Sequence, residues 1–188
     1  MEAWPGVFYH PETWAMLVAY VDDLVLAAFK GQMAKIWKAI AARVVFKDPA
    51  QPLGKYLGAF HLIDEYEPNN ASKPRTLRIS MRDYAKQAVS KYLADGPGPL
   101  RYVRTPYITD KEWGSENETP GVHAVTCSSH VATLLFMERM ARPDIAPAVQ
   151  RLCRVVSRWT TTHDKALHRL FSYVNSTLDC ELVGTLSP

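Results

Sequence analysis

Two adjacent carboxylates, Asp22 and Asp23, are the residues of this chain best suited to chemistry. They lie between two apolar runs, Trp14 to Ala19 and Leu24 to Phe29, whose composition is typical of buried strands joined by a turn. Carboxylate oxygens suit Mg²⁺, and two Mg²⁺ ions about 3.5 to 4 Å apart stabilise the attacking and leaving oxygens of phosphoryl transfer. The pattern predicts a metal site at a hairpin tip. A solvated turn is the alternative, because Asp is common in turns.

The segments after this hairpin predict the elements that position it. The first is a helix from Gly31 to about Val44, with apolar residues on a face that should pack under the sheet. After it we expect a strand over Leu53 to Asp64, a strand over Thr76 to Met81, a helix over Arg82 to Ala94, three helices over Ser128 to Met140, Pro143 to Trp159 and Thr162 to Ser176, and a short strand near Cys180 to Val183. Thr161 and Asp164 have the spacing of a capping box at the last helix.

The tetrad Tyr20 to Asp23 inside an apolar hairpin resembles the active-site motif of reverse transcriptases, in the YVDDL version of copia-type retrotransposons. Further segments follow in that family's order. They are Phe46-Lys47-Asp48 with Tyr56-Leu57-Gly58, Leu77 to Ser80 with Tyr84, Thr105-Pro106, Val131 to Phe136, Arg142 to Ile145 with Ala148-Val149, and a set from His163 to Leu182. Blocks in the right order are more specific than any one motif. Asp164 stands where the family commonly has Trp, a departure that we interpret as drift at a packing position.

The resemblance implies roles for several residues. Asp22 and Asp23 would be catalytic and would bind Mg²⁺, with Mn²⁺ as an alternative ion. Tyr20 would pack near the primer end. The segment Tyr56-Leu57-Gly58 resembles the primer grip, where a glycine permits close approach of backbone to the primer. A glycine at an ordinary strand bulge is the alternative for Gly58.

Three arginines at i, i+3 and i+7, Arg151, Arg154 and Arg158, form a basic stripe on the expected helix from Pro143 to Trp159. Such a stripe could contact the phosphates of a template–primer duplex. The alternative is a solvated helix face. A net charge of +3 allows nucleic-acid binding without requiring it.

The fold class that we expect is α+β, a partial antiparallel palm followed by a helical thumb. Residues 1–96 would form the partial palm, 97–121 a linker, and 122–188 the thumb and connection. In the family, a longer segment before the tetrad supplies the fingers, the front palm and an earlier catalytic Asp, whereas residues 1–19 alone precede Tyr20 here. Mg²⁺ needs more ligands than two carboxylates provide. We therefore expect the chain to be a polyprotein fragment, inactive alone.

Composition excludes several other classes of protein. The hydrophobic share of 47% and charged share of 22% are ordinary for a globular chain, and no apolar run is long enough for a membrane helix, so no membrane partner is expected. Three separate cysteines, Cys127, Cys153 and Cys180, predict free thiols in a reducing compartment. The six histidines include no H-E-x-x-H motif, so zinc is not expected.

Two functions follow as hypotheses. In the first, the chain is part of a retrotransposon RNA-directed DNA polymerase whose partners are an RNA template, a DNA primer, deoxynucleotides and the remainder of the polymerase. Its place would be intracellular, in the cytoplasm or a virus-like particle. In the second, it is a non-catalytic remnant of a transposable element that at most binds nucleic acid.

Overall fold

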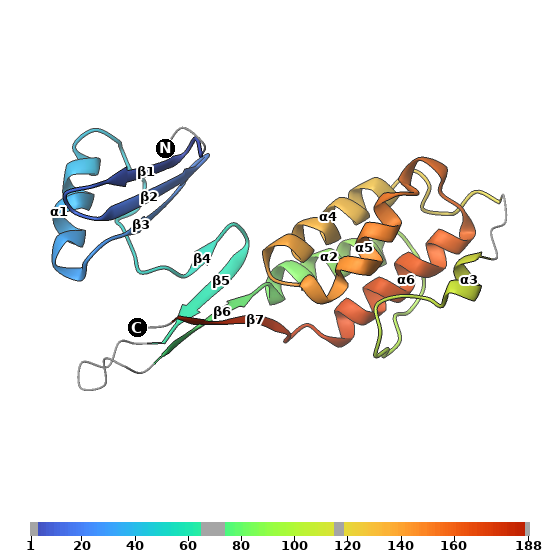
Figure 1. Ribbon diagram of the computed structural model, residues 1–188. Helices are drawn as coiled ribbons and strands as arrows, with labels where there is room; N and C mark the ends of the chain where they lie inside the picture. The colour runs from blue at the N-terminus through green and yellow to red at the C-terminus, as the bar shows by residue number, and fades with distance from the viewer. Residues whose placement is uncertain (1–3, 65–73, 115–118, 187–188) are drawn as a thin grey trace. The chain divides into compact units, whose positions relative to one another are not determined.

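The computed structural model describes residues 4–64, 74–114 and 119–186, and the chain divides into two compact units, Met1–Leu57 and Gly58–Pro188 (Figure 1). Antiparallel strands occur in both units, and of the six α-helices among the described residues five belong to the second unit. The fold class is therefore α+β, as the sequence predicts. The division falls at Leu57, before the expected palm-to-thumb linker of residues 97–121.

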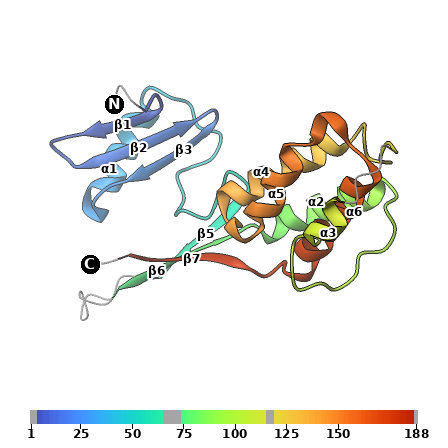
Figure 2. The same ribbon diagram turned by 45° about the vertical axis from the view of Figure 1, so that its right-hand side comes forward.

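The first unit is a three-stranded antiparallel sheet with one helix against it (Figure 2). Its elements are β1 (Val7–His10), β2 (Ala15–Tyr20), β3 (Asp23–Ala27) and α1 (Lys30–Ala41). The order β1-β2-β3 follows the chain, and β2 pairs with β3 from Met16↔Ala27 to Tyr20↔Asp23. The expected apolar hairpin and the helix after it are thus both present.

The first unit buries few of its apolar side chains. Of its described residues only Ala15 is buried, although Met33, Ile36, Trp37 and Ile40 of α1 are half-buried. Several large apolar side chains are exposed, among them Trp14 at 71% and Phe29 at 65%. Because apolar burial is the main stabilising term in folding, this unit has little of its own to hold it together.

The second unit begins with strands and continues with helices. Its strands are β5 (Ala59–Ile63), β6 (Arg75–Ser80) and β7 (Glu181–Leu186), preceded by β4 (Lys55–Tyr56) at the boundary. Its helices are α2 (Arg82–Ala94), α3 (Asp110–Gly114), α4 (Cys127–Met140), α5 (Ala146–Cys153) and α6 (Thr161–Ser176), with 3-10 turns at η2 (Pro143–Ile145) and η3 (Val156–Arg158). The strand β7 returns to pair antiparallel with β6, from Ser80↔Glu181 to Arg75↔Leu186.

The main core of the protein lies among α2, α4, α5 and α6. Tyr92 of α2 is at its centre, fully buried and stacked on Phe171 of α6 with ring centroids 4.1 Å apart. The apolar face of α2 therefore packs on the later helices, which places residues 82–94 with them in one unit. Burial of this kind contributes about 1.5–3 kcal/mol per large side chain.

A buried arginine joins two segments of the helical region. Arg142, 2% exposed, donates to both carboxylate oxygens of Asp144 at 2.9 and 2.8 Å, and to the carbonyl and hydroxyl oxygens of Thr177 at 3.0 and 2.7 Å. The planar guanidinium suits this fork-like recognition. The hydrogen bonds from Arg142 to Thr177 thus fix the start of η2 against the end of α6.

Three sequence predictions about local structure are wrong. The expected strand from Leu53 to Asp64 is interrupted, because Leu57 and Gly58 adopt positive φ values of 47° and 76° that turn the chain between β4 and β5. The expected helix from Pro143 to Trp159 is also interrupted, since α5 ends at Cys153. The capping box of α6 begins at Thr160, whose backbone N–H donates to Nδ1 of His163 at 3.0 Å.

Candidate functional site

The tip of the β2–β3 hairpin consists of Val21 and Asp22, between the paired residues Tyr20 and Asp23. Val21 has φ 52° and is 86% exposed. A positive φ is unusual for a β-branched residue, and backbone strain of this kind is concentrated at functional sites. The hairpin therefore holds its two acids on a tight turn at the edge of the first unit.

Both carboxylates are exposed but contribute to different hollows of the first unit. Asp23 lines one of about 680 Å³ together with Met33 and Trp37 of α1. Asp22 lines a smaller one, of about 210 Å³, that also includes Asp48. Asp22 lies in the turn and Asp23 at the first position of β3, so the two side chains leave the backbone from different local conformations.

Two tyrosines of the expected site lie near Asp23. Partial burial, and then the charges of Asp23 and Tyr20, raise the pKa of the Tyr56 hydroxyl. An electrostatic effect of this kind requires that the groups be close. The first unit thus brings together Tyr20, Asp23 and Tyr56, which the sequence analysis placed in one site.

The donors at the hairpin fit Mg²⁺ in type but fall short in number. Asp22 and Asp23 offer hard oxygen ligands, whereas octahedral Mg²⁺ takes six ligands, some of them waters or substrate phosphates. Within residues 4–64, 74–114 and 119–186, no third His, Cys, Asp or Glu joins these two in a compact ligand group. The hairpin therefore supplies a partial metal site.

The glycine of the expected primer grip has a local explanation. Gly58 has φ 76°, a conformation that side chains rarely adopt. A Cβ there would lie 3.5 Å from Cδ2 of Tyr84, an ordinary contact, so space does not require glycine. The backbone turn alone accounts for Gly58, and a primer contact at Tyr56-Leu57-Gly58 stays a prediction.

The three arginines of the expected basic stripe come from three different backbone segments. Arg151 is on α5, Arg154 is the residue that ends it, and Arg158 is in η3. Arg151 is engaged within the protein, since its guanidinium donates to Asp110 at 2.7 Å and lies 4.2 Å from the ring centre of Trp113. Arg154 and Arg158 are exposed and remain available for phosphate contacts.

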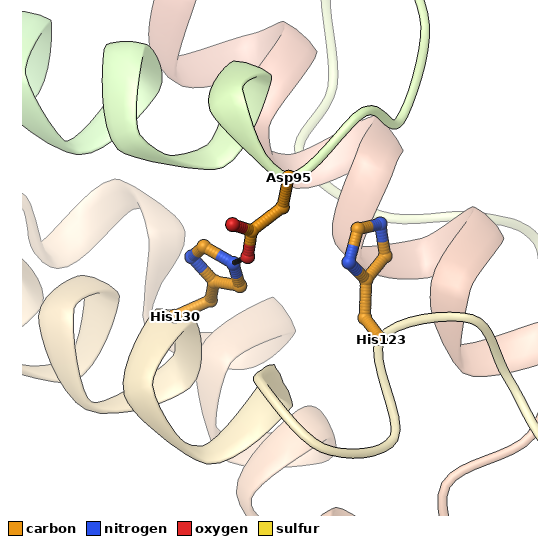
Figure 3. A group of neighbouring side chains, drawn as sticks. All are labelled: Asp95, His123 and His130. Atoms are coloured by element: carbon orange, nitrogen blue, oxygen red, sulfur yellow. Dashed lines mark hydrogen bonds and ion pairs between the residues drawn. The ribbon is translucent and has the colours of Figure 1, made fainter.

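A second group of ligand-type residues lies in the helical region. Asp95, His123 and His130 each present a ligand atom, and these atoms all lie within 4.8 Å of one another (Figure 3). The sequence alone does not reveal this group, because its members are far apart in the chain and belong to three separate segments. Only the spacing of the two histidines, seven positions apart, is a local signal, and it matches no standard zinc motif.

The remaining sequence predictions concern cysteines and the membrane. Cys127, Cys153 and Cys180 are free thiols, as expected. In the part of the chain that the structure describes, no helix has the length and apolar character needed to cross a membrane.

Comparisons with known proteins identify no related family, protein or structure. A scan against protein-family models and searches of curated proteins and of solved structures find no match to this chain. Its function must therefore be argued from its own residues and from the resemblance of its motifs.

Proposed function

We propose that this chain is part of an RNA-directed DNA polymerase of the copia-type retrotransposon class, and that it provides two metal-binding carboxylates of the catalytic site. The observation that supports this most is the position of Asp22 and Asp23 at the tip of an apolar hairpin whose Val21 has φ 52°. A turn strained at a β-branched residue is costly, and it is most easily understood where the tip must present these acids in one geometry.

In the proposed site, Asp22 and Asp23 hold Mg²⁺, with Mn²⁺ as an alternative, against the primer end and the incoming deoxynucleotide. The bound ions would favour deprotonation of the primer 3′-hydroxyl and stabilise the charge of the departing pyrophosphate. Tyr20 and Tyr56, close to Asp23, would pack against the primer terminus. Arg154 and Arg158 would contact duplex phosphates without reading sequence.

The proposed partners follow from the incomplete ligand set. Because the described residues place no third ligand-type side chain with Asp22 and Asp23, a carboxylate from elsewhere must complete the site. We propose that fingers and front palm of the same polymerase supply it, and that the isolated chain does not extend a primer. A non-catalytic remnant that binds nucleic acid is the second candidate, favoured by the same shortage of ligands.

Primer extension on an RNA template tests the proposal. The assay compares the chain alone with the chain plus a copia-type fingers and front-palm piece supplied in trans, both with Mg²⁺. We expect extension only in the second case, and its loss in Asp22→Asn and Asp23→Asn. Glu12→Gln, which neutralises another exposed acid of the first unit, is the matched control. Absence of extension with both folded pieces present would support the remnant.

A further inference from the structure

The group of Asp95, His123 and His130 has the composition of a transition-metal site. Two imidazoles and one carboxylate are a ligand set found for Zn²⁺ in sites that keep one coordination position open. All three come from the helical region of the second unit, far along the chain from the hairpin acids. The group is therefore independent of the proposed polymerase site.

The three residues are held by different elements that converge at this point. Asp95 ends α2, followed by Gly96 with φ 78°, which stops the helix. His130 belongs to the start of α4, and His123 lies in the loop that precedes it. In Figure 3 the three side chains point toward one another from these segments. A bound ion would join the end of α2 to α4 and its leading loop.

Packing orients both imidazoles. His130 is 1% exposed, with its ring edge-on to Tyr92 at 5.3 Å between centroids and to Phe171 at 5.7 Å. His123 is 4% exposed, and its ring lies 5.3 Å from that of Tyr92. Ligands whose rotamers are fixed by surrounding packing lose little freedom when a metal binds. This preorganisation favours metal binding.

The loop that contains His123 is fixed by the carboxylate of Asp164. Its two oxygens accept from the backbone N–H groups of Val122 at 2.6 Å and His123 at 3.2 Å, and from Nε1 of Trp159 at 2.7 Å. A Cβ on Gly121 would lie 2.7 Å from that carboxylate and 2.6 Å from Trp159. Asp164 is therefore a structural anchor, which corrects its interpretation as drift at a packing position.

The histidine rings differ in their present partners. Nε2 of His130 is 2.7 Å from Oδ2 of Asp95, a hydrogen bond that lowers the pKa of the Asp95 carboxyl. For the His123 ring, the described residues provide no hydrogen bond. A nearly buried imidazole that makes no hydrogen bond through its ring has a ring nitrogen available to coordinate a metal ion.

The distances require only small adjustments to hold an ion. Tetrahedral Zn²⁺ with bonds of 2.0–2.2 Å places its ligand atoms about 3.3–3.5 Å apart. The Asp95–His130 pair, at 2.7 Å, would have to open by less than about 1 Å, and because no pair is more than 4.8 Å apart, none would have to close by more than about 1.5 Å. The Asp95 side chain is 32% exposed, so it can rotate and gives an ion access from solvent.

The location of Asp95 is a further reason to expect a cation. The C-terminal end of a helix carries a partial negative charge, and a carboxylate there is disfavoured unless a positive group lies nearby. Asp95 stands at the end of α2 with two imidazoles beside it. We propose that Asp95, His123 and His130 bind Zn²⁺ or a similar first-row divalent cation, which clamps α2 to α4 and to the loop before it.

Calorimetric titration of the full chain with Zn²⁺, in the presence of excess Mg²⁺, tests this proposal. We expect one Zn²⁺ per chain, and a melting temperature raised by about 5–10 °C at a hundredfold excess over Kd. Asp95→Asn and His123→Gln should each weaken binding about tenfold or more. Asp95→Asn is the cleaner variant, because Asn can still accept the hydrogen bond from His130 and the position is partly exposed.

Two matched controls show whether the ion is held here. Asp83→Asn removes an exposed carboxylate from the first turn of the same helix, and His10→Gln removes an exposed imidazole from the first unit. Both should bind Zn²⁺ as the unchanged chain does. Failure of the folded chain to bind Zn²⁺, or equal binding by Asp95→Asn and His123→Gln, would overturn the proposal. Either result leaves the primer-extension test unaffected, since that assay reads Asp22 and Asp23.

Discussion

Replacing Asp164 by alanine should destabilise the second unit substantially. Its carboxylate accepts three N–H groups, from Val122, His123 and Trp159. Val122 is 84% exposed, so its N–H can turn to water, whereas His123 at 4% and Trp159 at 5% exposure cannot. A buried donor left without a partner costs about 1–3 kcal/mol. Two such donors predict a loss of about 2–6 kcal/mol.

Urea unfolding followed by far-UV circular dichroism measures this loss, because most helices belong to the second unit. The same loss predicts a melting temperature lower by about 5–15 °C. Both buried donors bond Oδ1, and Asp164→Asn can keep an oxygen at that position, so it should lose clearly less stability than Asp164→Ala. Asp179→Ala is the control, since that carboxylate is 81% exposed and pairs with the exposed Arg82. A surface pair of this type is worth about 0–1 kcal/mol.

The reasoning would be refuted if Asp164→Ala and Asp179→Ala unfolded at the same urea concentration. That result would mean that the loop before α4 finds other partners when the carboxylate is removed. A loss confined to Asp164→Ala, with Asp164→Asn intermediate, would establish the carboxylate as the anchor of the segment that contains His123.

Two further predictions concern the helical region. Arg142→Ala should cost about 1.5–3 kcal/mol in urea unfolding, because it removes the hydrogen bonds that this buried guanidinium donates to Asp144 and Thr177, whereas Arg139→Ala, at an exposed position, should change stability by less than about 0.5 kcal/mol. Burial lowers the pKa of His168, so the unfolded chain binds a proton there more readily than the folded one. The contribution of His168 is full above the unfolded pKa of about 6.5 and is lost as pH falls through that value. Urea midpoints measured from pH 7.5 to 5 should therefore fall less steeply for His168→Gln than for the unchanged chain or His10→Gln, and equal slopes would contradict the assignment.

Local signals in the sequence were sufficient for several elements. The helix over Arg82 to Ala94 has the predicted bounds, because its apolar spacing is regular and Asp95-Gly96-Pro97 stops it. The β2–β3 hairpin could also be predicted, because two apolar runs flank the two adjacent Asp residues. In each case the deciding interactions are between near neighbours in the chain.

Other features depend on tertiary packing and have no local signal in the sequence. Apolar residues continue at helical spacing past Cys153, yet the chain leaves the helix there. Val155 is buried from a turn, and Trp159 from the residue that follows the 3-10 segment η3. The convergence of Asp95, His123 and His130 depends on how α2 docks on α4. Neither can be read from spacing, because each is set by contacts between distant segments.

The pairing of β6 with β7 also bears on how the chain matures during synthesis. Strand residues Arg75 and Leu186 are neighbours in the sheet, although the whole helical region lies between them in sequence. Closing so long a loop is entropically expensive and slow compared with forming a helix. The helices can therefore collapse on one another while translation continues, but β6 must wait for its partner until β7 has left the ribosome. Until then the open edge of β6 is exposed to pairing with other chains, which makes the interval between the synthesis of β6 and that of β7 the period of greatest risk for aggregation.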